Sequence, residues 1–270
     1  MEALAAIESW PVEHAAAGVV RADGVVAARG DTERLFRWAS ITKLVTALAV
    51  LVAAEEGVVD LDEPAGPEGS TVRHLLAHAS GLPFESDGAA IGRVGARRIY
   101  SNEGFEQLAR HLEAAAEMPF ADYLREAVLE PLGMTRSELR GTAAAGLWGP
   151  LEDLLRLGRE LLAPTIVAPE TLAEATQVAF PGLDGVLPDF GRMTPNDWGL
   201  GFEIRDAKPG HWMGTAVSPR AFGHFGGSGT FLWVDPELGA ALGVLTDRPF
   251  GRWAKEAWPP LSDAVVAELP

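Results

Sequence analysis

A serine and a lysine three residues apart are the first feature of this sequence that could do chemistry. Ser40 and Lys43 belong to the segment SITK at the start of a long apolar run. Residues three apart lie on one face of a helix, so the hydroxyl and the amine would be within hydrogen-bonding reach. A serine hydroxyl is a weak nucleophile that an adjacent base activates. The alternative is a helix-capping serine beside a lysine that faces solvent.

The composition of the chain makes Lys43 informative. The sequence contains 19 arginines but only three lysines, and residues 44–54, which follow Lys43, carry no charge. A guanidinium stays protonated in proteins, whereas an amine removed from water can lose its proton and serve as a base. The choice of lysine in apolar surroundings therefore favours the catalytic pair over the cap.

A tyrosine and an asparagine form a second candidate element. Tyr100 and Asn102 lie in the segment YSN and use one of the two tyrosines and one of the two asparagines in the chain. A phenol can move a proton if nearby cations lower its pKa, and an amide can orient a substrate carbonyl. A turn that caps the helix expected from Glu103 explains the same residues, and both explanations can hold together.

A glycine-rich segment that enters a strand forms the third element. It is GHFGGSGT, residues 223–230, with His224 near its start and Gly226 and Gly227 following. Glycines let a backbone approach a ligand closely, and an exposed strand edge can present an N–H to a developing oxyanion. A bulged strand is the alternative explanation. The position of this segment after the other two elements in the chain is what favours a functional role.

The periodicity of the chain indicates which elements would hold these residues. Residues 40–56 form a helical run without Pro or Gly, and Gly57 ends it. Further helices are expected at 2–9, 72–78, 103–116, 120–129, 150–162, 169–176 and 253–269. A hairpin is expected at 17–28, strands at 198–204, 224–234 and 240–246, and an irregular loop at 181–196.

Strands at both ends and helices in the middle predict an α/β (α+β) fold. We expect an antiparallel sheet flanked by helices, with an inserted, mainly helical region. Residues 1–58 and 198–270 would form the discontinuous sheet region, and residues 59–197 would form the helical region. The sequence does not indicate whether residues 181–196 close over a cleft or how many chains associate.

Charge and residue usage exclude several function classes. The 270-residue chain has a formal net charge of −16 and a pI near 4.8, so its mean field would repel nucleic acid and anionic membranes. It has no cysteine, which excludes disulfides, thiolate metal sites and a cysteine nucleophile. No apolar run is long enough to cross a bilayer, and the acidic amino terminus does not look like a secretory signal. We therefore expect a cytoplasmic protein.

Other possible sites have weaker support. His74 and His78 have helical spacing, but Leu75 stands where a zinc protease needs its glutamate, so we expect neither a metal nor a cofactor. Gly227-Ser228-Gly229 is followed by Thr230 and is not the nucleophile motif of an α/β-hydrolase. Trp212 belongs to the core or lines an acyl pocket.

The ordered set Ser-x-x-Lys, Tyr-x-Asn and His-x-Gly resembles the serine β-lactamase and penicillin-binding-protein superfamily. It is most similar to the class C-like branch, which includes family VIII esterases and D-alanyl-D-alanine carboxypeptidases. Supporting stretches cover most of the chain: FRWASITK at 36–43, EEGVVDLDEP at 55–64, TVRHLLAHASGLP at 71–83, YSNEGF at 100–105, VLEPLGM at 128–134 and WGLGF at 198–202. The resemblance implies the β-lactamase-like fold.

The resemblance also implies roles for the first two elements. Ser40 would attack a carbonyl to form an acyl-enzyme, while Lys43 and Tyr100 exchange its proton. Tyr100 would later activate the hydrolytic water, and Asn102 would hold a substrate amide or ester oxygen. The implied substrate is a small-molecule ester or amide, with no cofactor and no metal.

The third element departs from the superfamily pattern. His224 stands where many relatives carry lysine, Gly226 completes the His-x-Gly motif, and the Gly227 N–H would complete an oxyanion hole with the Ser40 N–H. Histidine offers a less certain positive charge for a β-lactam carboxylate. Hydrolysis of a small carboxylic ester is therefore the leading hypothesis. The alternatives are an amide hydrolase of the β-lactamase or D-amino-acid peptidase type and a non-catalytic ligand-binding relative.

Overall fold

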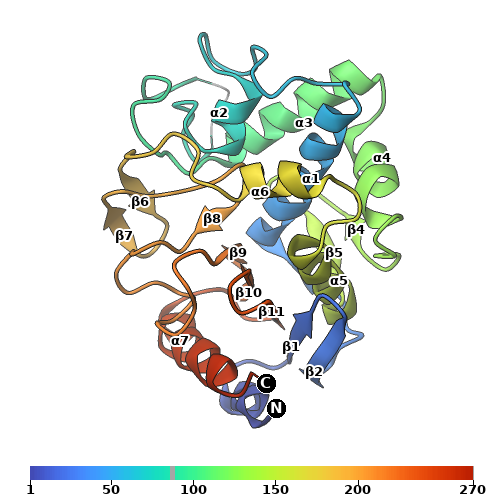
Figure 1. Ribbon diagram of the computed structural model, residues 1–270, viewed down its shortest axis with the longest axis vertical. Coiled ribbons are helices and arrows are strands. Elements are labelled where there is room, and N and C mark those ends of the chain that lie inside the picture. Colours follow the sequence, from blue (N-terminus) through green and yellow to red (C-terminus); the bar gives the residue numbers. More distant parts are fainter. Residues whose placement is uncertain (86–88, 270) are drawn as a thin grey trace.

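A six-stranded antiparallel sheet organises the protein, with helices on both of its faces (Figure 1). The computed structural model describes residues 1–85 and 89–269. The strand order is β2-β1-β11-β10-β9-β8. The strands are β1 (Ala15–Arg21), β2 (Gly24–Gly30), β8 (Glu203–Ile204), β9 (Phe222–Gly226), β10 (Thr230–Asp235) and β11 (Ala240–Thr246). The expected antiparallel sheet is confirmed.

The two ends of the chain meet in this sheet. The expected amino-terminal hairpin forms as β1 and β2, and β1 pairs with β11, so that Ala15 lies opposite Thr246. Close by, the Ala3 N–H donates to Glu268 Oε1 at 2.9 Å. The amino and carboxyl ends therefore lie side by side at one end of the molecule (Figure 1).

Strand β10 shows why the sheet carries two helical layers. Side chains alternate between the faces of a strand. Phe231 and Trp233 pack into one apolar cluster, whereas Leu232 and Val234 pack into a second cluster on the other face. Because both faces are apolar, each needs a covering layer.

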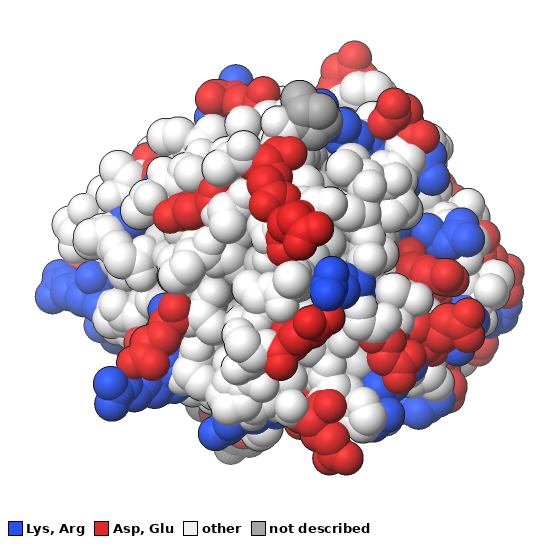
Figure 2. All heavy atoms as spheres, turned by 90° about the horizontal axis from the view of Figure 1, so that it is seen from below, with Lys and Arg blue, Asp and Glu red and all other residues white. Residues whose placement is uncertain are grey.

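Different helices cover the two faces. The carboxy-terminal helix α7 (Arg252–Ala267) and the 3₁₀ helix η1 (Glu2–Ser9) lie on the face that carries Trp233. Helix α5 (Leu151–Leu162) covers the other face beside β1, β10 and β11. The first helix was expected, but it is 3₁₀ rather than α. On the outer surface seen from below, acidic and basic side chains are interspersed (Figure 2).

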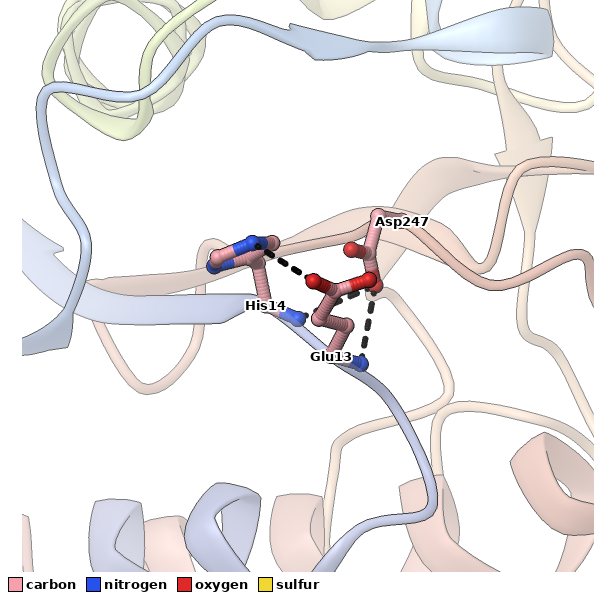
Figure 3. Close-up of side chains that lie close together, drawn as sticks. All are labelled: Glu13, His14 and Asp247. Carbon is pink, nitrogen blue, oxygen red and sulfur yellow. Dashed lines mark hydrogen bonds and ion pairs between the residues drawn. The ribbon is translucent and has the colours of Figure 1, made fainter.

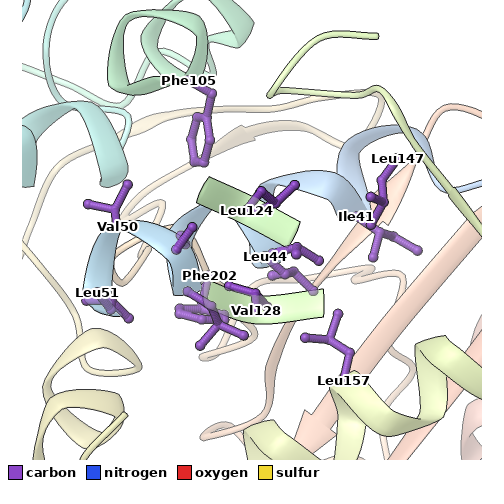
Figure 4. Close-up of a cluster of buried hydrophobic side chains, with 14 of the residues drawn as sticks. Ile41, Leu44, Val50, Leu51, Phe105, Leu124, Val128, Leu147, Leu157 and Phe202 are labelled. Atoms are coloured by element: carbon purple, nitrogen blue, oxygen red, sulfur yellow. The ribbon is translucent and has the colours of Figure 1, made fainter. Parts of the chain in front are cut away.

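Helix α1 (Thr42–Glu55) is the central element of the helical layer. Every residue from Thr42 to Ala53 is buried, as expected for a helix that is apolar all round. Leu44 and Val50 pack against Phe105 and Leu124 from neighbouring helices (Figure 4). The remaining helical elements are α2 (Val72–Leu76), α3 (Asn102–Ala116), α4 (Phe120–Leu124), the π-helical turn η3 (Arg125–Leu129) and α6 (Pro169–Ala175).

The structure differs from the expected elements in three places. Residues 224–234 are not one strand: β9 and β10 are joined by the turn 227–229, which the glycines permit. The irregular segment 181–196 contains a hairpin of β6 (Gly185–Leu187) and β7 (Gly191–Met193). Only 203–204 of the expected strand 198–204 lie in the sheet. A small sheet of β3 (Phe36–Arg37), β5 (Leu147–Gly149) and β4 (Glu138–Leu139) completes the strands of the described residues.

The division into a sheet region, 1–58 and 198–270, and a helical region, 59–197, stays a prediction. Helix α5 belongs by sequence to the middle segment but packs on the sheet. Among the residues described, none of the helices has the length and apolar character needed to span a membrane.

Candidate active site

Ser40 lies in a short 3₁₀ turn, η2 (Ala39–Ile41), directly before helix α1. The preceding Ala39 has φ +48°, a left-handed conformation that a residue with a Cβ adopts at a cost. Such strained positions are frequent at functional sites. Ser40 is half-buried and lines a pocket of about 850 Å³ together with Asn102 and Gly227. The hydroxyl is therefore open to a small ligand.

Lys43, one helical turn after Ser40, is completely buried. Its Nζ donates to Asn102 Oδ1 at 2.6 Å and to the Ala144 carbonyl at 3.0 Å. Burial lowers the pKa of this amine to about 7, although the Glu106 carboxylate raises it. A neutral amine has two hydrogens and one lone pair, and two acceptors hold the two hydrogens. The lone pair remains for a third direction, which suits a general base.

Tyr100 lies beside Lys43, whose Nζ is 4.8 Å from the centroid of the phenol ring. A phenol moves a proton more readily if nearby cations lower its pKa, but in this structure the net shift is upward. Burial raises the pKa of Tyr100 well above its ordinary value, a hydrogen bond with Ser40 lowers it, and the Glu203 carboxylate raises it further. Tyr100 is therefore a neutral phenol at pH 7.

The buried guanidinium of Arg98 fixes the segment that ends at Tyr100. Arg98 donates to the carbonyls of Ala77 at 2.7 Å, Phe180 at 3.1 Å and Asn196 at 3.2 Å. Three separate loops thus converge on the residue two positions before the phenol. Removing a guanidinium that satisfies several buried carbonyls would free these loops, because each carbonyl would lose its partner.

Asn102 is the first residue of α3, and Ser101 is the N-cap, as expected. The Ser101 hydroxyl accepts from the Gly104 N–H at 2.9 Å and donates to the Pro83 carbonyl at 2.6 Å. Because Asn102 Oδ1 accepts from Lys43, its NH₂ group is the half of the amide that can donate to a substrate oxygen. Asn102 thus accepts a hydrogen bond from Lys43 and also lines the pocket.

The turn between β9 and β10 lies against the segment before Ser40. Ser228 Oγ donates to the Arg37 carbonyl at 2.6 Å, and Thr230 Oγ1 donates to the Trp38 carbonyl at 3.0 Å. A Cβ on Gly226 would come within 2.4 Å of that Trp38 carbonyl, so only glycine allows this approach. These contacts place the backbone of the turn beside the segment that ends at Ser40.

Gly227 lies in this turn and lines the same pocket as Ser40. Within the described part of the chain, neither the Gly227 N–H nor the Ser40 N–H donates to a backbone or side-chain acceptor. Gly227 is exposed and Ser40 is half-buried, so both N–H groups are open to a ligand in the pocket. Two unused donors beside a nucleophile are what a developing oxyanion requires.

A family model described as Beta-lactamase matches residues 9–265. The chain belongs to the Beta-lactamase family. The match covers both the nucleophile turn and the β9–β10 turn, so the expected recognition and fold class are confirmed.

Relatives support membership of the Beta-lactamase family. A crystal structure described as a beta-lactamase from Mycobacterium bovis has 54% sequence identity and a TM-score of 0.97, with 99% of each chain covered. Penicillin-binding protein 4* of Bacillus subtilis is 26% identical over 58% of this chain and 42% of its own length. The D-alanyl-D-alanine-carboxypeptidase/endopeptidase AmpH of Escherichia coli is 28% identical over 39% of this chain and 37% of its own. The chain thus spans about two fifths of the curated relatives it matches.

His224, the histidine of the third candidate element, is uncharged in this structure. It lies on β9, is buried, and its Nδ1 is 2.6 Å from the Phe225 carbonyl, so Nδ1 carries the hydrogen. Burial lowers its pKa to about 3, and the Lys43 ammonium lowers it further, so the ring is neutral at pH 7. His224 therefore supplies no positive charge to a substrate carboxylate.

Three residues near the site were not predicted as site residues. Phe84 lines the pocket and stacks on Tyr100, with ring centroids 5.8 Å apart. His78, at which no metal was expected, has its ring 4.7 Å from that of Tyr100. Glu106 lies four residues after Asn102 on α3. Its sequence context does not predict a role in the site, because an acidic residue at helical spacing usually faces solvent.

Glu106 fixes the position of the Ala144 loop, which in turn binds Lys43. Its Oε1 accepts from the Ala144 N–H at 2.9 Å, and the Ala144 carbonyl accepts from Lys43 Nζ. Glu106 also lines the pocket, and its negative charge stabilises the protonated form of Lys43. The carboxylate therefore positions the lysine through one peptide unit and opposes the loss of its proton.

Replacing Glu106 with glutamine is expected to shift the acidic limb of the kcat/KM profile to lower pH by about one unit. The amide oxygen keeps the acceptor for Ala144, while the lost negative charge lets Lys43 deprotonate more easily. Glu113→Gln is the matched control, because Glu113 also accepts a backbone N–H, from Phe120 at 2.9 Å, on the same helix. An unchanged limb in Glu106→Gln would contradict the electrostatic role.

Two other features near the pocket have structural explanations. Glu13, His14 and Asp247 lie close together (Figure 3), but Asp247 Oδ1 already accepts the N–H groups of Glu13 at 3.2 Å and His14 at 3.0 Å. Asp247 therefore joins the ends of β1 and β11. Trp212 is fully buried and donates to Glu203 Oε2 at 2.8 Å, so it belongs to the core rather than to an acyl pocket.

Proposed function

We propose that the protein is a serine hydrolase that cleaves a small carboxylic ester through an acyl-enzyme on Ser40. The observation that carries the proposal is the buried Lys43 amine, whose pKa of about 7 lets it lose its proton near neutral pH, and which stands one turn from a pocket-lining serine. A lysine with a lowered pKa beside a nucleophile is the arrangement that makes a serine reactive at neutral pH.

The proposed reaction has two halves. Lys43 Nζ takes the proton of Ser40 Oγ as the oxygen bonds to the substrate carbonyl carbon. The N–H groups of Ser40 and Gly227 donate to the oxyanion that forms. As the carbon–oxygen bond to the alcohol breaks, Tyr100 gives its proton to the leaving oxygen and receives one from the Lys43 ammonium. Water then bonds to the acyl carbon and gives one proton to Tyr100, which passes its own proton to Lys43 Nζ. As the bond between that carbon and Ser40 Oγ breaks, the Lys43 ammonium returns this proton to Ser40 Oγ, and the carboxylic acid leaves.

The neutral state of His224 supports an ester over a β-lactam or a peptide with a free carboxylate. Such amide substrates carry an anionic group next to the scissile bond, and a cation nearby would bind it. With a pKa near 3, His224 is uncharged at any pH at which Lys43 is neutral. An ester without a carboxylate needs no such cation.

A fluorophosphonate probe is expected to add its mass to Ser40 in the native protein. Ser40→Ala removes the only oxygen the probe could bond at this position and is expected to abolish the label. Mass spectrometry of the tryptic peptide that contains residue 40 measures both results. A native, folded protein that stays unlabelled would favour the non-catalytic ligand-binding alternative.

Amide hydrolysis is the second candidate, because the Mycobacterium bovis structure at 54% identity is described as a beta-lactamase. Rates with p-nitrophenyl acetate and butyrate, measured beside rates with the β-lactam nitrocefin, separate the two candidates. We expect faster turnover of the esters. Faster turnover of nitrocefin would reverse the order.

A further inference from the structure

A second pocket adjoins the candidate active site. It has a volume of about 610 Å³, within the range of small-molecule sites. Phe84 lines both this pocket and the one that contains Ser40, so the two hollows share one aromatic wall. The reaction mechanism above does not assign a role to the second pocket.

The nucleophile and the phenol belong to different pockets. Ser40 and Gly227 line the first pocket, whereas Tyr100 lines the second. Phe84 stacks on Tyr100 at an interplanar angle of 24°, so the two rings lie together where the pockets meet. A substrate whose carbonyl reaches Ser40 can therefore extend on one side into the first pocket and on the other side past Tyr100.

The direction of proton transfer decides which half of the substrate lies in which pocket. Formation of the acyl-enzyme makes the bond between Ser40 Oγ and the carbonyl carbon and breaks the bond between that carbon and the alcohol oxygen. The departing oxygen must receive one proton, and Tyr100 is the donor on the side of the second pocket. The acyl half stays on Ser40 in the first pocket.

We propose that the second pocket, lined by Phe84, Ile99, Tyr100 and Val186, binds the alcohol half of the ester substrate, and that this alcohol is apolar. The assignment rests on the proposed function, because it requires an ester cleaved at Ser40. Val186 on β6 is 60% exposed and Phe84 is 52% exposed, which are high values for large apolar side chains. An apolar alcohol would cover these side chains and remove them from water.

The charged side chains of this pocket fit an uncharged alcohol. Arg192 is paired with Asp184, and the Arg98 guanidinium is occupied by backbone carbonyls. Arg97 is exposed, so water can solvate its charge. The pocket thus offers apolar contact without a carboxylate free to bind a cationic alcohol.

Val186→Asp tests the assignment with two series of esters. The first series keeps the acetyl group and lengthens the alcohol from ethyl to hexyl acetate. The second keeps p-nitrophenol and lengthens the acyl group from acetate to hexanoate. We expect native kcat/KM to rise with alcohol length and Val186→Asp to lower the hexyl-to-ethyl ratio by about tenfold, since several methylenes lose their apolar contact. The hexanoate-to-acetate ratio should stay unchanged.

Val25→Asp is the matched control, because Val25 is 57% exposed on β2 and lies outside both pockets. It should leave both ratios as in the native protein. A fall of the acyl ratio in Val186→Asp would show that the second pocket holds the acyl half and overturn the assignment. So would two unchanged ratios, or a native enzyme indifferent to alcohol length. A native protein that cleaves no ester in either series would instead refute the proposed function itself.

Discussion

Lys43→Met is expected to lower kcat/KM for ester hydrolysis by about 10³-fold, the range in which general-base catalysis contributes. Methionine fills the volume of the side chain but cannot accept a proton from Ser40. Lys43→Arg is expected to lose a similar factor, because a guanidinium retains its charge and its proton at any working pH. The measurement is steady-state hydrolysis of p-nitrophenyl butyrate by purified variants.

The pH dependence of the native enzyme checks the same assignment independently. The Lys43 ammonium must lose its proton before the amine can act as a base, and its pKa is about 7. We therefore expect kcat/KM to be low at acidic pH, to rise through pH 7, and to level off above it. The residual kcat/KM of Lys43→Met should not show this rise through pH 7.

Controls separate catalysis from folding for Lys43. Lys255 is exposed on α7, and Lys255→Met should keep native activity, because this lysine lies outside both pockets. Circular dichroism melting shows whether each variant is folded. A folded Lys43→Met or Lys43→Arg enzyme with most of the native rate would show that another group takes the proton of Ser40.

Glu203→Ala is expected to destabilise the fold by about 3–5 kcal/mol, the cost of removing one partner from a buried ion pair. Glu203 is completely buried and lies between the Lys208 amine, the His211 imidazole and the Trp212 indole. Its carboxylate accepts from Lys208 Nζ at 3.1 Å, His211 Nε2 at 2.8 Å and Trp212 Nε1 at 2.8 Å. The alanine would leave all three donors without this acceptor.

The pKa of Glu203 sets the pH window of this contribution. Burial raises the pKa, but the Lys208 and His211 charges and hydrogen bonds from His211 and Trp212 lower it further, so the net shift is downward. A carboxyl with a lowered folded-state pKa contributes stability above its unfolded pKa and loses it as pH falls through the folded value. The difference in stability between the native protein and Glu203→Ala should therefore persist at neutral pH and shrink only under strongly acidic conditions.

Urea unfolding at pH 7 measures the free energy lost in Glu203→Ala. The matched control is Glu256→Ala, which removes an exposed carboxylate paired with Arg252 on α7. That surface pair is expected to contribute less than about 1 kcal/mol. A loss in Glu203→Ala no greater than the loss in Glu256→Ala would contradict the assigned role of the buried cluster.

The sequence indicates the candidate site residues more directly than it indicates their surroundings. Ser40 and Lys43 could be found because helical spacing places i and i+3 together, and Tyr100 and Asn102 because their residue types are scarce. The low basicity of Lys43 could be expected from its apolar neighbours. The raised pKa of Tyr100 could not, because it depends on burial among segments far apart in the chain.

The remaining differences arise from contacts that local patterns do not encode. The split of 224–234 into two strands depends on the turn at 227–229. The glycines of this segment are compatible with a turn and equally with a bulge in a single strand. Glu106 and Glu203 resemble surface acids in the sequence. Tertiary packing brings Glu106 against Ala144 and Glu203 against Lys208. A single sequence cannot distinguish these acids from solvated ones.

The order of the strands has a consequence for how the enzyme is made on the ribosome. Ser40 and Lys43 are synthesised early, but Gly227 and β11, one of the two neighbours of β1 in the sheet, come from residues beyond 220. Pairing across so long a stretch is slow to form and depends on the late strands. A nascent chain would carry Ser40 through much of its synthesis without the Gly227 N–H, the second of the two proposed oxyanion donors. Hydrolytic competence would then arise abruptly, once β11 has emerged from the exit tunnel and joined β1.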